Sequence, residues 1–165
     1  MIMINLHIIF LIYSFLMGSP YLATKKKQVD LILKVLKPKK RKIFYELGCG
    51  DGRIVRRAVK KYEVLGYGFD VNPLLLCLAK FFARRDKLKN IFFKRKNILK
   101  INYQKADYVY LFFLPELMEK IKKKLENELP KEAIIISHGF PFLGWEKKLF
   151  KKIEEKSFST YFYKK

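Results

Sequence analysis

Cysteine, histidine and glycine are all scarce in this 165-residue chain, with two, two and eight copies respectively. The cysteines, Cys49 and Cys77, form no Cys-x-x-Cys pair, and no histidine cluster accompanies them. A disulfide framework and a zinc site are therefore disfavoured, and we expect no metal. We interpret both cysteines as small buried residues of a reducing compartment. Internal repeats are absent too, and the length suits a single domain.

Acidic residues are also few: 15 Asp and Glu stand against 36 Lys and Arg, a formal net charge of +21. One interpretation is attraction to an anionic partner, either a lipid headgroup layer or nucleic acid. The other is codon bias, because an AT-rich genome favours lysine codons and lysine dominates the basic residues. Charge alone names no partner, and nucleic acid stays open without being favoured. Because half of the residues are hydrophobic and 16% are aromatic, the chain can bury a core, which disfavours disorder.

An apolar run covers residues 2–17, with only three polar residues inside it. As a helix it would rise roughly 24 Å, a little short of a ~30 Å hydrocarbon core. A cleaved signal peptide normally starts with positive charge, and no Lys or Arg precedes Lys25. A buried core helix is an alternative. We favour a membrane anchor.

The basic residues that follow this run set the expected topology. Lys25, Lys26 and Lys27 lie just past it, so the positive-inside rule places the rest of the chain on the cytoplasmic side. We therefore expect a membrane-anchor helix over residues 1–19 and a domain over residues 20–165 that faces the cytoplasm.

After the anchor, apolar strands and amphipathic helices alternate. Alternation with short connections predicts right-handed βαβ units. The fold class is α/β: a doubly wound, mostly parallel, seven-stranded, Rossmann-like sheet with an N-terminal apolar helix, its last two strands forming an edge hairpin. The expected strands are 42–47, 64–70, 91–94, 106–113, 133–137, 148–154 and 158–163, and the expected helices are 25–36, 53–61, 73–86 and 115–129.

A glycine-rich turn between the first strand and its helix is the sharpest signal. It carries Gly48, Cys49, Gly50 and Gly52, and Glu46 lies two residues before it. A dinucleotide motif would read Gly-x-Gly-x-x-Gly, whereas the spacing here is Gly-x-Gly-x-Gly. A carboxylate at the strand end is awkward beside a pyrophosphate. It suits the cationic amino-acid end of S-adenosylmethionine, which we predict as the cofactor.

Two further polar residues end the next strands. Asp70 lies 24 residues after Glu46 and is placed to accept hydrogen bonds from ribose hydroxyls. Asn97 follows the third strand, where an amide could contact the adenine edge. A simple turn residue is the alternative for Asn97.

The segment after the fourth strand reads Phe113-Leu114-Pro115-Glu116. Methyltransferases that act on exocyclic amino groups of bases often carry Asn-Pro-Pro-Tyr or a relative here, and its absence disfavours a base-modifying enzyme. Glu116 could serve only as a first-turn helix residue that the helix dipole favours.

With these residues in hand, the chain resembles the small seven-strand protein-lysine N-methyltransferases. That family includes mitochondrial enzymes acting on the adenine nucleotide translocase and on subunit c of ATP synthase, and compact archaeal lysine methyltransferases. The resemblance runs from Pro20 to the C-terminus, and Asn97 departs from it where relatives tend to have Asp. It rests on Pro20-Tyr21-x-x-Thr24, Glu46 to Arg53, Asn72-Pro73, Phe113-Leu114-Pro115, Glu128-Leu129-Pro130, and Ser137-x-x-Phe140 leading to Trp145.

The resemblance implies methyl transfer to the ε-amine of an accessible lysine in a protein. Tyr21, Phe113 and Pro115 would form the target-lysine slot, with Tyr21 and Thr24 on a segment over the cofactor. An apolar slot in a basic protein would lower the pKa of the incoming amine. The cofactor-binding residues would be Glu46, Gly48, Cys49, Gly50, Gly52, Asp70, Asn72 and Asn97.

Two alternatives remain open at this stage. One is a methyltransferase of another substrate class: a lipid, a small molecule or RNA. The other is a non-catalytic, basic membrane-surface adaptor on the same fold. The intact Glu46, the three glycines and Asp70 argue against the adaptor.

Overall fold

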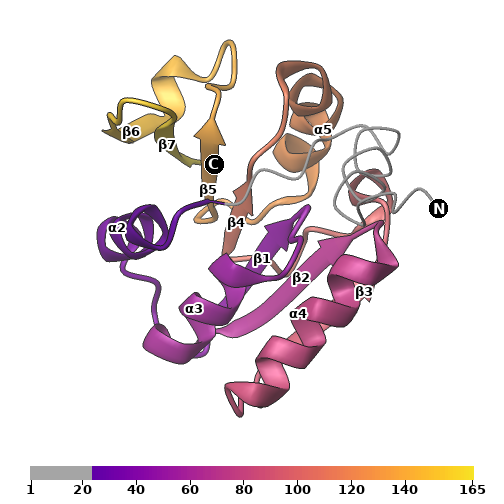
Figure 1. The fold of residues 1–165 in the computed structure, drawn as a ribbon. Helices are drawn as coiled ribbons and strands as arrows, with labels where there is room; N and C mark the ends of the chain where they lie inside the picture. The colour runs from indigo at the N-terminus through magenta and orange to yellow at the C-terminus, as the bar shows by residue number, and fades with distance from the viewer. Residues whose placement is uncertain (1–23) are drawn as a thin grey trace, which may run out of the picture.

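One seven-stranded β-sheet organises residues 24–165, the part of the chain that the computed structural model describes (Figure 1). The strand order is β3-β2-β1-β4-β5-β7-β6. Neighbouring strands from β3 to β5 are parallel, whereas β7 runs antiparallel to both β5 and β6. The mostly parallel sheet and the edge hairpin are thus confirmed. The strands are β1 Ile43–Leu47, β2 Leu65–Asp70, β3 Ile91–Arg95, β4 Tyr108–Leu111, β5 Ile134–Gly139, β6 Leu149–Ile153 and β7 Ser159–Lys164.

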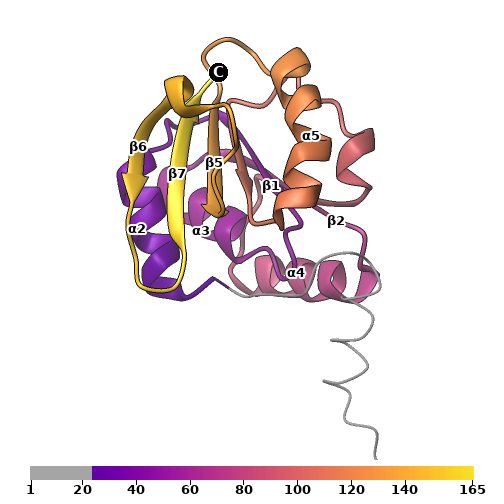
Figure 2. The same cartoon turned by 90° about the horizontal axis from the view of Figure 1, so that it is seen from above.

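Helices cover both faces of the sheet (Figure 2). Apolar residues of α2 and α3 form one core cluster with Phe44, Tyr108 and Ile136, and α4 packs on the same face. The opposite cluster joins α5 to Tyr45, Leu47 and Val109. Because successive strand residues point to opposite faces, β1 sends Phe44 to one core and Tyr45 to the other. The helices are α2 Lys26–Leu36, α3 Arg53–Tyr62, α4 Pro73–Arg85 and α5 Pro115–Glu128, with short 3₁₀ helices η1 Ile98–Lys100 and η2 Glu146–Lys148.

Local sequence sets where the two proline-led helices begin. Pro73 and Pro115 each occupy the first helical position, where the missing N–H of proline costs nothing. Asn72 caps α4, because its side-chain oxygen accepts hydrogen bonds from the backbone N–H groups of Leu74 and Leu75. Both starts agree with those predicted from the sequence.

The strand order reverses between β1 and β4. The chain winds outward from β1 to β3, then returns to the other side of β1 as β4 and β5. The two central strands pair in parallel, with Glu46 opposite Tyr110 and Leu47 opposite Leu111. In open α/β sheets, such a reversal opens a crevice beyond the carboxyl ends of the strands. The site is therefore expected there.

Two expectations need correction. The fourth strand was predicted over 106–113 but covers only Tyr108–Leu111, because Phe113 leaves the ladder and packs over Gly48. Cys49 is buried as predicted, whereas Cys77 is exposed. The apolar sequence around Cys77 suggested a core position, but helical spacing puts Cys77 on the outer side of α4, three residues after the exposed Leu74.

The predicted anchor lies outside the described residues, as does Tyr21. Over residues 24–165, we find no helix that combines the length and the apolarity needed to cross a bilayer.

Candidate active site

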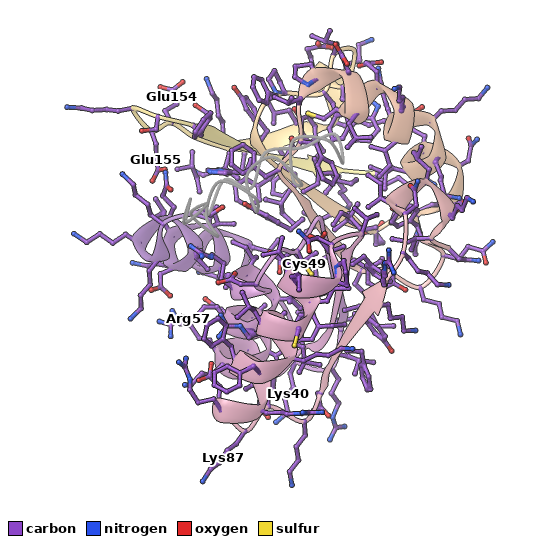
Figure 3. All side chains as sticks on the ribbon, turned by 45° about the vertical axis from the view of Figure 1, so that its right-hand side comes forward. Lys40, Cys49, Arg57, Lys87, Glu154 and Glu155 are labelled. Atoms are coloured by element: carbon purple, nitrogen blue, oxygen red, sulfur yellow. The ribbon has the colours of Figure 1, made fainter. Side chains whose placement is uncertain are left out.

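A cavity of about 340 Å³ opens at the carboxyl ends of the central strands. Segments that follow β1, β2, β3, β4 and β5 all contribute to its wall, as does the segment that precedes β7. The residues lining it are Thr24, Glu46, Gly48, Cys49, Asp51, Arg53, Ile54, Asp70, Val71, Asn72, Leu75, Lys96, Asn97, Ile98, Leu99, Tyr110, Phe112, Phe113, Leu114, Leu117, Phe140 and Phe158. Figure 3 labels Cys49, which lies near the centre of the molecule.

The glycine turn has a backbone that other residues rarely adopt. Gly48, Gly50 and Gly52 have φ angles of +63°, +52° and +70°. A Cβ on Gly48 would lie 2.7 Å from the ring of Phe113, and one on Gly52 would lie 2.5 Å from the ring of Phe93. Both positions therefore require glycine for conformation and for space. The turn keeps a strip of bare backbone beside the cavity.

Glu46 is a buried carboxyl group at the end of β1. It is 4% exposed, and its Oε2 accepts a hydrogen bond of 2.9 Å from the backbone N–H of Val55 in α3. Burial raises the pKa of Glu46 well above its ordinary value, despite that hydrogen bond. A cationic group bound beside it would favour the charged carboxylate. The site can thus hold an ammonium group in the interior.

Asp70 joins the end of β2 to the glycine turn. Its Oδ2 accepts a hydrogen bond from the Gly50 N–H and its Oδ1 accepts one from the Asn72 N–H, each 2.8 Å long. These bonds fix the carboxylate in one orientation at the cavity wall. Each oxygen has a second lone pair, so that hydroxyl groups of a ligand could also donate to it.

Asn72 carries a polar atom that lacks a partner. Its side-chain oxygen caps α4, whereas its Nδ2 is buried and makes no hydrogen bond to any residue from 24 to 165. A buried amide donor left unpaired is costly in free energy, about 1–3 kcal/mol. Because Asn72 lines the cavity, a small shift of its amide would bring this donor to a ligand acceptor and remove the cost. The residues present therefore fit a nucleoside with acceptor atoms on this side.

Thr24 contacts β4 and the start of α3. Its side-chain oxygen lies 3.2 Å from the Tyr110 hydroxyl, and its carbonyl accepts a hydrogen bond of 3.1 Å from Arg53 Nη1. Arg53 also pairs with Asp51 at 3.0 Å. The cavity end near Glu46 thus holds a guanidinium group and the N-terminus of α3 beside a buried carboxyl group. That arrangement suits a zwitterionic amino-acid group.

The cavity wall on the side of β4, β5 and β7 is aromatic. Phe112, Phe140 and Phe158, here called the aromatic wall, come from the end of β4, the segment after β5 and the segment before β7. The Phe112 and Phe158 rings meet edge to face, with centroids 5.1 Å apart. Gly139, with a φ of +94°, leaves room for Phe112, because a Cβ there would lie 2.6 Å from its ring. The wall is apolar and faces the same space as Glu46.

His138 supports this wall from behind. Its ring meets that of Phe112 edge to face at 4.7 Å, and its Nδ1 lies 2.8 Å from the Thr160 side-chain oxygen. Burial lowers the pKa of His138 to about 4. The imidazole is therefore neutral at physiological pH, and the wall carries no charge from this side.

Replacing His138 by asparagine should reduce the loss of unfolding free energy that occurs when the pH is lowered. The unfolded chain binds a proton at this histidine from about pH 6.5 downward, whereas the folded protein resists it until about pH 4. The contribution of His138 to the free energy of unfolding is therefore complete above pH 6.5. It falls by about 3 kcal/mol between pH 6.5 and pH 4. Urea unfolding at pH 7.5 and pH 4.5 measures it. An equal loss in wild type and His138→Asn would contradict the assignment.

The structure brings most of the predicted site residues together. Glu46, Gly48, Cys49, Asp70, Asn72, Asn97 and Phe113 all line the cavity. Gly50 and Gly52 do not line it: Gly50 donates to Asp70, and Gly52 precedes the first residue of α3. Asn97 is exposed, and its oxygen accepts from the Leu99 N–H, so it also acts as a turn residue. Pro115 is an exposed first helical residue and does not line the cavity.

Several residues of the site had no clear signal in the sequence. Tyr110 and Phe112 belong to an apolar run in which every residue suits a buried strand. Phe140 was noted only as part of the resemblance, and Phe158 only as a strand residue. Tyr110 could be placed at the site only from its pairing with Glu46 across β1 and β4. Predicting that pairing requires the strand order of the sheet.

Comparison with solved structures places the fold. The structure matches an RNA methyltransferase from Salinibacter ruber, solved in complex with S-adenosyl-L-homocysteine, with a TM-score of 0.83 and 25% sequence identity. The match covers 87% of this chain and 93% of that one. Together with the glycine turn and its flanking acids, this defines a Rossmann-like methyltransferase that uses S-adenosylmethionine.

Sequence comparisons narrow the class to one family. The profile of the ANTKMT methyltransferase domain matches residues 46–149. The protein-lysine N-methyltransferase of Saccharolobus islandicus (strain REY15A) is 31% identical over 152 residues, which cover 86% of this chain and 89% of that protein. The chain belongs to the ANTKMT methyltransferase family.

The adenine nucleotide translocase lysine N-methyltransferase of Mus musculus is also similar. It is 31% identical over 128 residues, and the match covers 77% of this chain. The match covers only 56% of the length of that mouse protein, whereas it covers 89% of the Saccharolobus islandicus protein.

Proposed function

We propose that this protein transfers methyl groups from S-adenosylmethionine to the ε-amine of lysine in a protein substrate. One observation carries the proposal: a single cavity joins a buried carboxyl group, an amide donor with no partner in the described part of the chain, and an aromatic wall. The first two suit the cofactor, and the third suits an amine entering from the opposite end. Both named relatives are lysine methyltransferases of proteins.

The cofactor end of the cavity is assigned residue by residue. Glu46 would hold the ammonium group of the amino-acid end, beside the backbone of Gly48 and Cys49. Asp70 would accept hydrogen bonds from the ribose hydroxyls. Asn72 and Asn97 would lie toward the base, where Asn72 Nδ2 offers its unused donor. Gly50 and Gly52 would act indirectly, by fixing Asp70 and the start of α3.

The amine end is assigned to the aromatic wall together with Phe113. This changes the slot expected from the sequence, because Pro115 is exposed outside the cavity. Aromatic faces attract ammonium groups and their methylated forms. A slot of this kind also admits the long apolar stem of lysine while it excludes water.

The cofactor, when bound, supplies an electrophilic methyl group on a sulfonium. The attacking lysine must be neutral, and its ordinary pKa is about 10.4. Burial against the aromatic wall lowers the pKa of the incoming amine, and the positive charge of the protein acts in the same direction. The cavity-lining acids within residues 24–165, Glu46, Asp51 and Asp70, belong to the cofactor end. The chain therefore contributes desolvation and alignment rather than a strong base at the wall.

Methylation of cell lysate with tritiated S-adenosylmethionine tests the reaction. We expect label in protein, removed by protease and located on lysine by mass spectrometry. The Salinibacter ruber structure and the net charge of +21 make RNA the second candidate. Label released by ribonuclease would overturn the protein substrate, and label extracted into organic solvent would indicate a lipid.

We also propose that residues 2–17 anchor the protein in a membrane, with residues 24–165 on the cytoplasmic side. The support is the apolar composition of the segment and the three lysines after it. Carbonate extraction of cell membranes tests this proposal. Release of the protein into the supernatant would contradict it.

A further inference from the structure

The outer side of α4 exposes a line of apolar side chains. Leu74, Leu78 and Phe81 are 65%, 45% and 59% exposed. They are spaced at helical intervals of four and three, so they form one stripe along the helix. Cys77 is exposed beside them. Single exposed leucines are common on protein surfaces. Three large apolar residues aligned along one side of a helix form a patch that indicates an interaction surface.

The stretch of chain that carries this stripe and continues through β3 is rich in basic residues and poor in acids. Residues 73–100 contain nine Lys and Arg, all exposed, and a single acid, Asp86. Asp86 forms an ion pair with Arg56 of α3 at 3.0 Å, so its charge is matched within the fold. Lys87, just past α4, extends away from the body of the molecule (Figure 3). The nine are Lys80, Arg84, Arg85, Lys87, Lys89, Lys94, Arg95, Lys96 and Lys100.

We propose that this surface, formed by the outer side of α4 and the adjoining edge strand β3, docks onto an anionic lipid bilayer. An apolar helical stripe flanked by Lys and Arg is the pattern of helices that lie in the membrane interface. The basic residues attract the anionic headgroups, and the two leucines and Phe81 enter the acyl boundary. Nucleic acid would match the charge but offers nothing for Leu74 and Leu78 to enter.

The position of the stripe links docking to the site. α4 begins at the cavity, because Asn72 and Leu75 line it, and the exposed Leu74 lies between them. Thr24, where the described chain begins, lines the same cavity. A bilayer held against α4 would thus lie close to the residues at the start of this helix that line the cavity. The inference concerns where the enzyme works, and it holds whatever group accepts the methyl.

The exposed Cys77 offers a direct test in the full-length chain. It can be labelled with an environment-sensitive NBD probe, whereas Cys49 is buried. The proposed anchor at residues 2–17 would hold the chain on vesicles of any composition, so the probe signal, not vesicle binding, reports docking of α4. We expect a blue shift of the probe with phosphatidylglycerol-containing vesicles, quenching by lipid-borne nitroxides, and loss of the blue shift in high salt. Vesicles of pure phosphatidylcholine should give at most a tenth of the response. The probe placed instead at position 150 of β6, through Cys77→Ser and Phe150→Cys, should not respond.

Charge reversal gives the matched pair of variants. Lys80→Glu with Arg84→Glu should raise the anionic lipid needed for half the response at least ten-fold, whereas Lys147→Glu with Lys151→Glu on the opposite edge should leave it within two-fold. No shift with anionic vesicles would overturn the proposal. So would an equal shift with neutral vesicles, a shifted probe before any lipid is added, or a response to RNA alone. None of these outcomes bears on whether lysine is methylated.

Discussion

Glu46→Gln is expected to abolish useful cofactor binding while leaving the protein folded. Glutamine keeps the shape of the side chain and can still accept the Val55 N–H hydrogen bond. It cannot pair with the ammonium group of S-adenosylmethionine. Removing one partner of a buried charged pair costs about 2–5 kcal/mol, so the dissociation constant should rise by about 30-fold or more. Titration calorimetry with S-adenosylhomocysteine measures it.

The same substitution should stabilise the protein in the absence of cofactor. Because the pKa of Glu46 is raised in the folded state, the unfolded chain releases this proton at lower pH than the folded protein does. The contribution of Glu46 to stability is therefore lost as pH rises through its folded pKa. Glutamine does not titrate, so Glu46→Gln should melt higher at pH 8, by roughly 2–4 °C for each 1 kcal/mol gained. Weaker binding together with a lower melting temperature would instead indicate a damaged fold.

Glu132→Gln is the matched control for charge. Glu132 is an exposed acid with a surface ion pair to Lys164, far from the cavity in the fold. Its replacement should leave both cofactor affinity and melting temperature unchanged within error. Retained affinity in Glu46→Gln at every pH would remove Glu46 from the cofactor site.

The second large effect is expected at the aromatic wall. Phe158→Ala removes a ring that lines the cavity and braces Phe112. The incoming amine would then meet water and lose its alignment, so kcat/KM for the protein substrate should fall about 100-fold. Cofactor affinity should stay within about three-fold, because the cofactor end is unchanged. Phe158→Leu, which keeps apolar bulk without the ring, should fall between Phe158→Ala and wild type if the ring attracts the amine.

Phe150→Ala controls for loss of a phenyl ring. Phe150 is exposed on β6 and does not line the cavity. Its loss should change kcat/KM by less than two-fold. An active Phe158→Ala variant with kcat/KM near wild type would place the amine elsewhere, whereas loss of both activity and cofactor affinity would show a collapsed cavity.

The elements that local chemistry controls could be read from the sequence. Pro73 and Pro115 mark helix starts because proline lacks an N–H, and the glycine turn is visible because positive φ angles favour glycine. Glu46 and Asp70 could be singled out as candidates because Glu46 lies just before that turn and Asp70 ends the next strand. The exposure of Cys77 could not be predicted, because an apolar helix sequence does not show which side of the helix packs against the sheet.

The sequence by itself determined the strands, the helices, the glycine turn and the acids beside it, because these depend on residues close together along the chain. Only the tertiary structure decided the aromatic wall, the Asn72 Nδ2 that lacks a partner among residues 24–165, and the exposed stripe on α4. Phe112, Phe140 and Phe158 come from three separate segments, and they meet because the strand order reverses beside β1 and the chain returns as an antiparallel hairpin. Such meetings depend on which strands become neighbours, and that is settled by packing across the whole sheet.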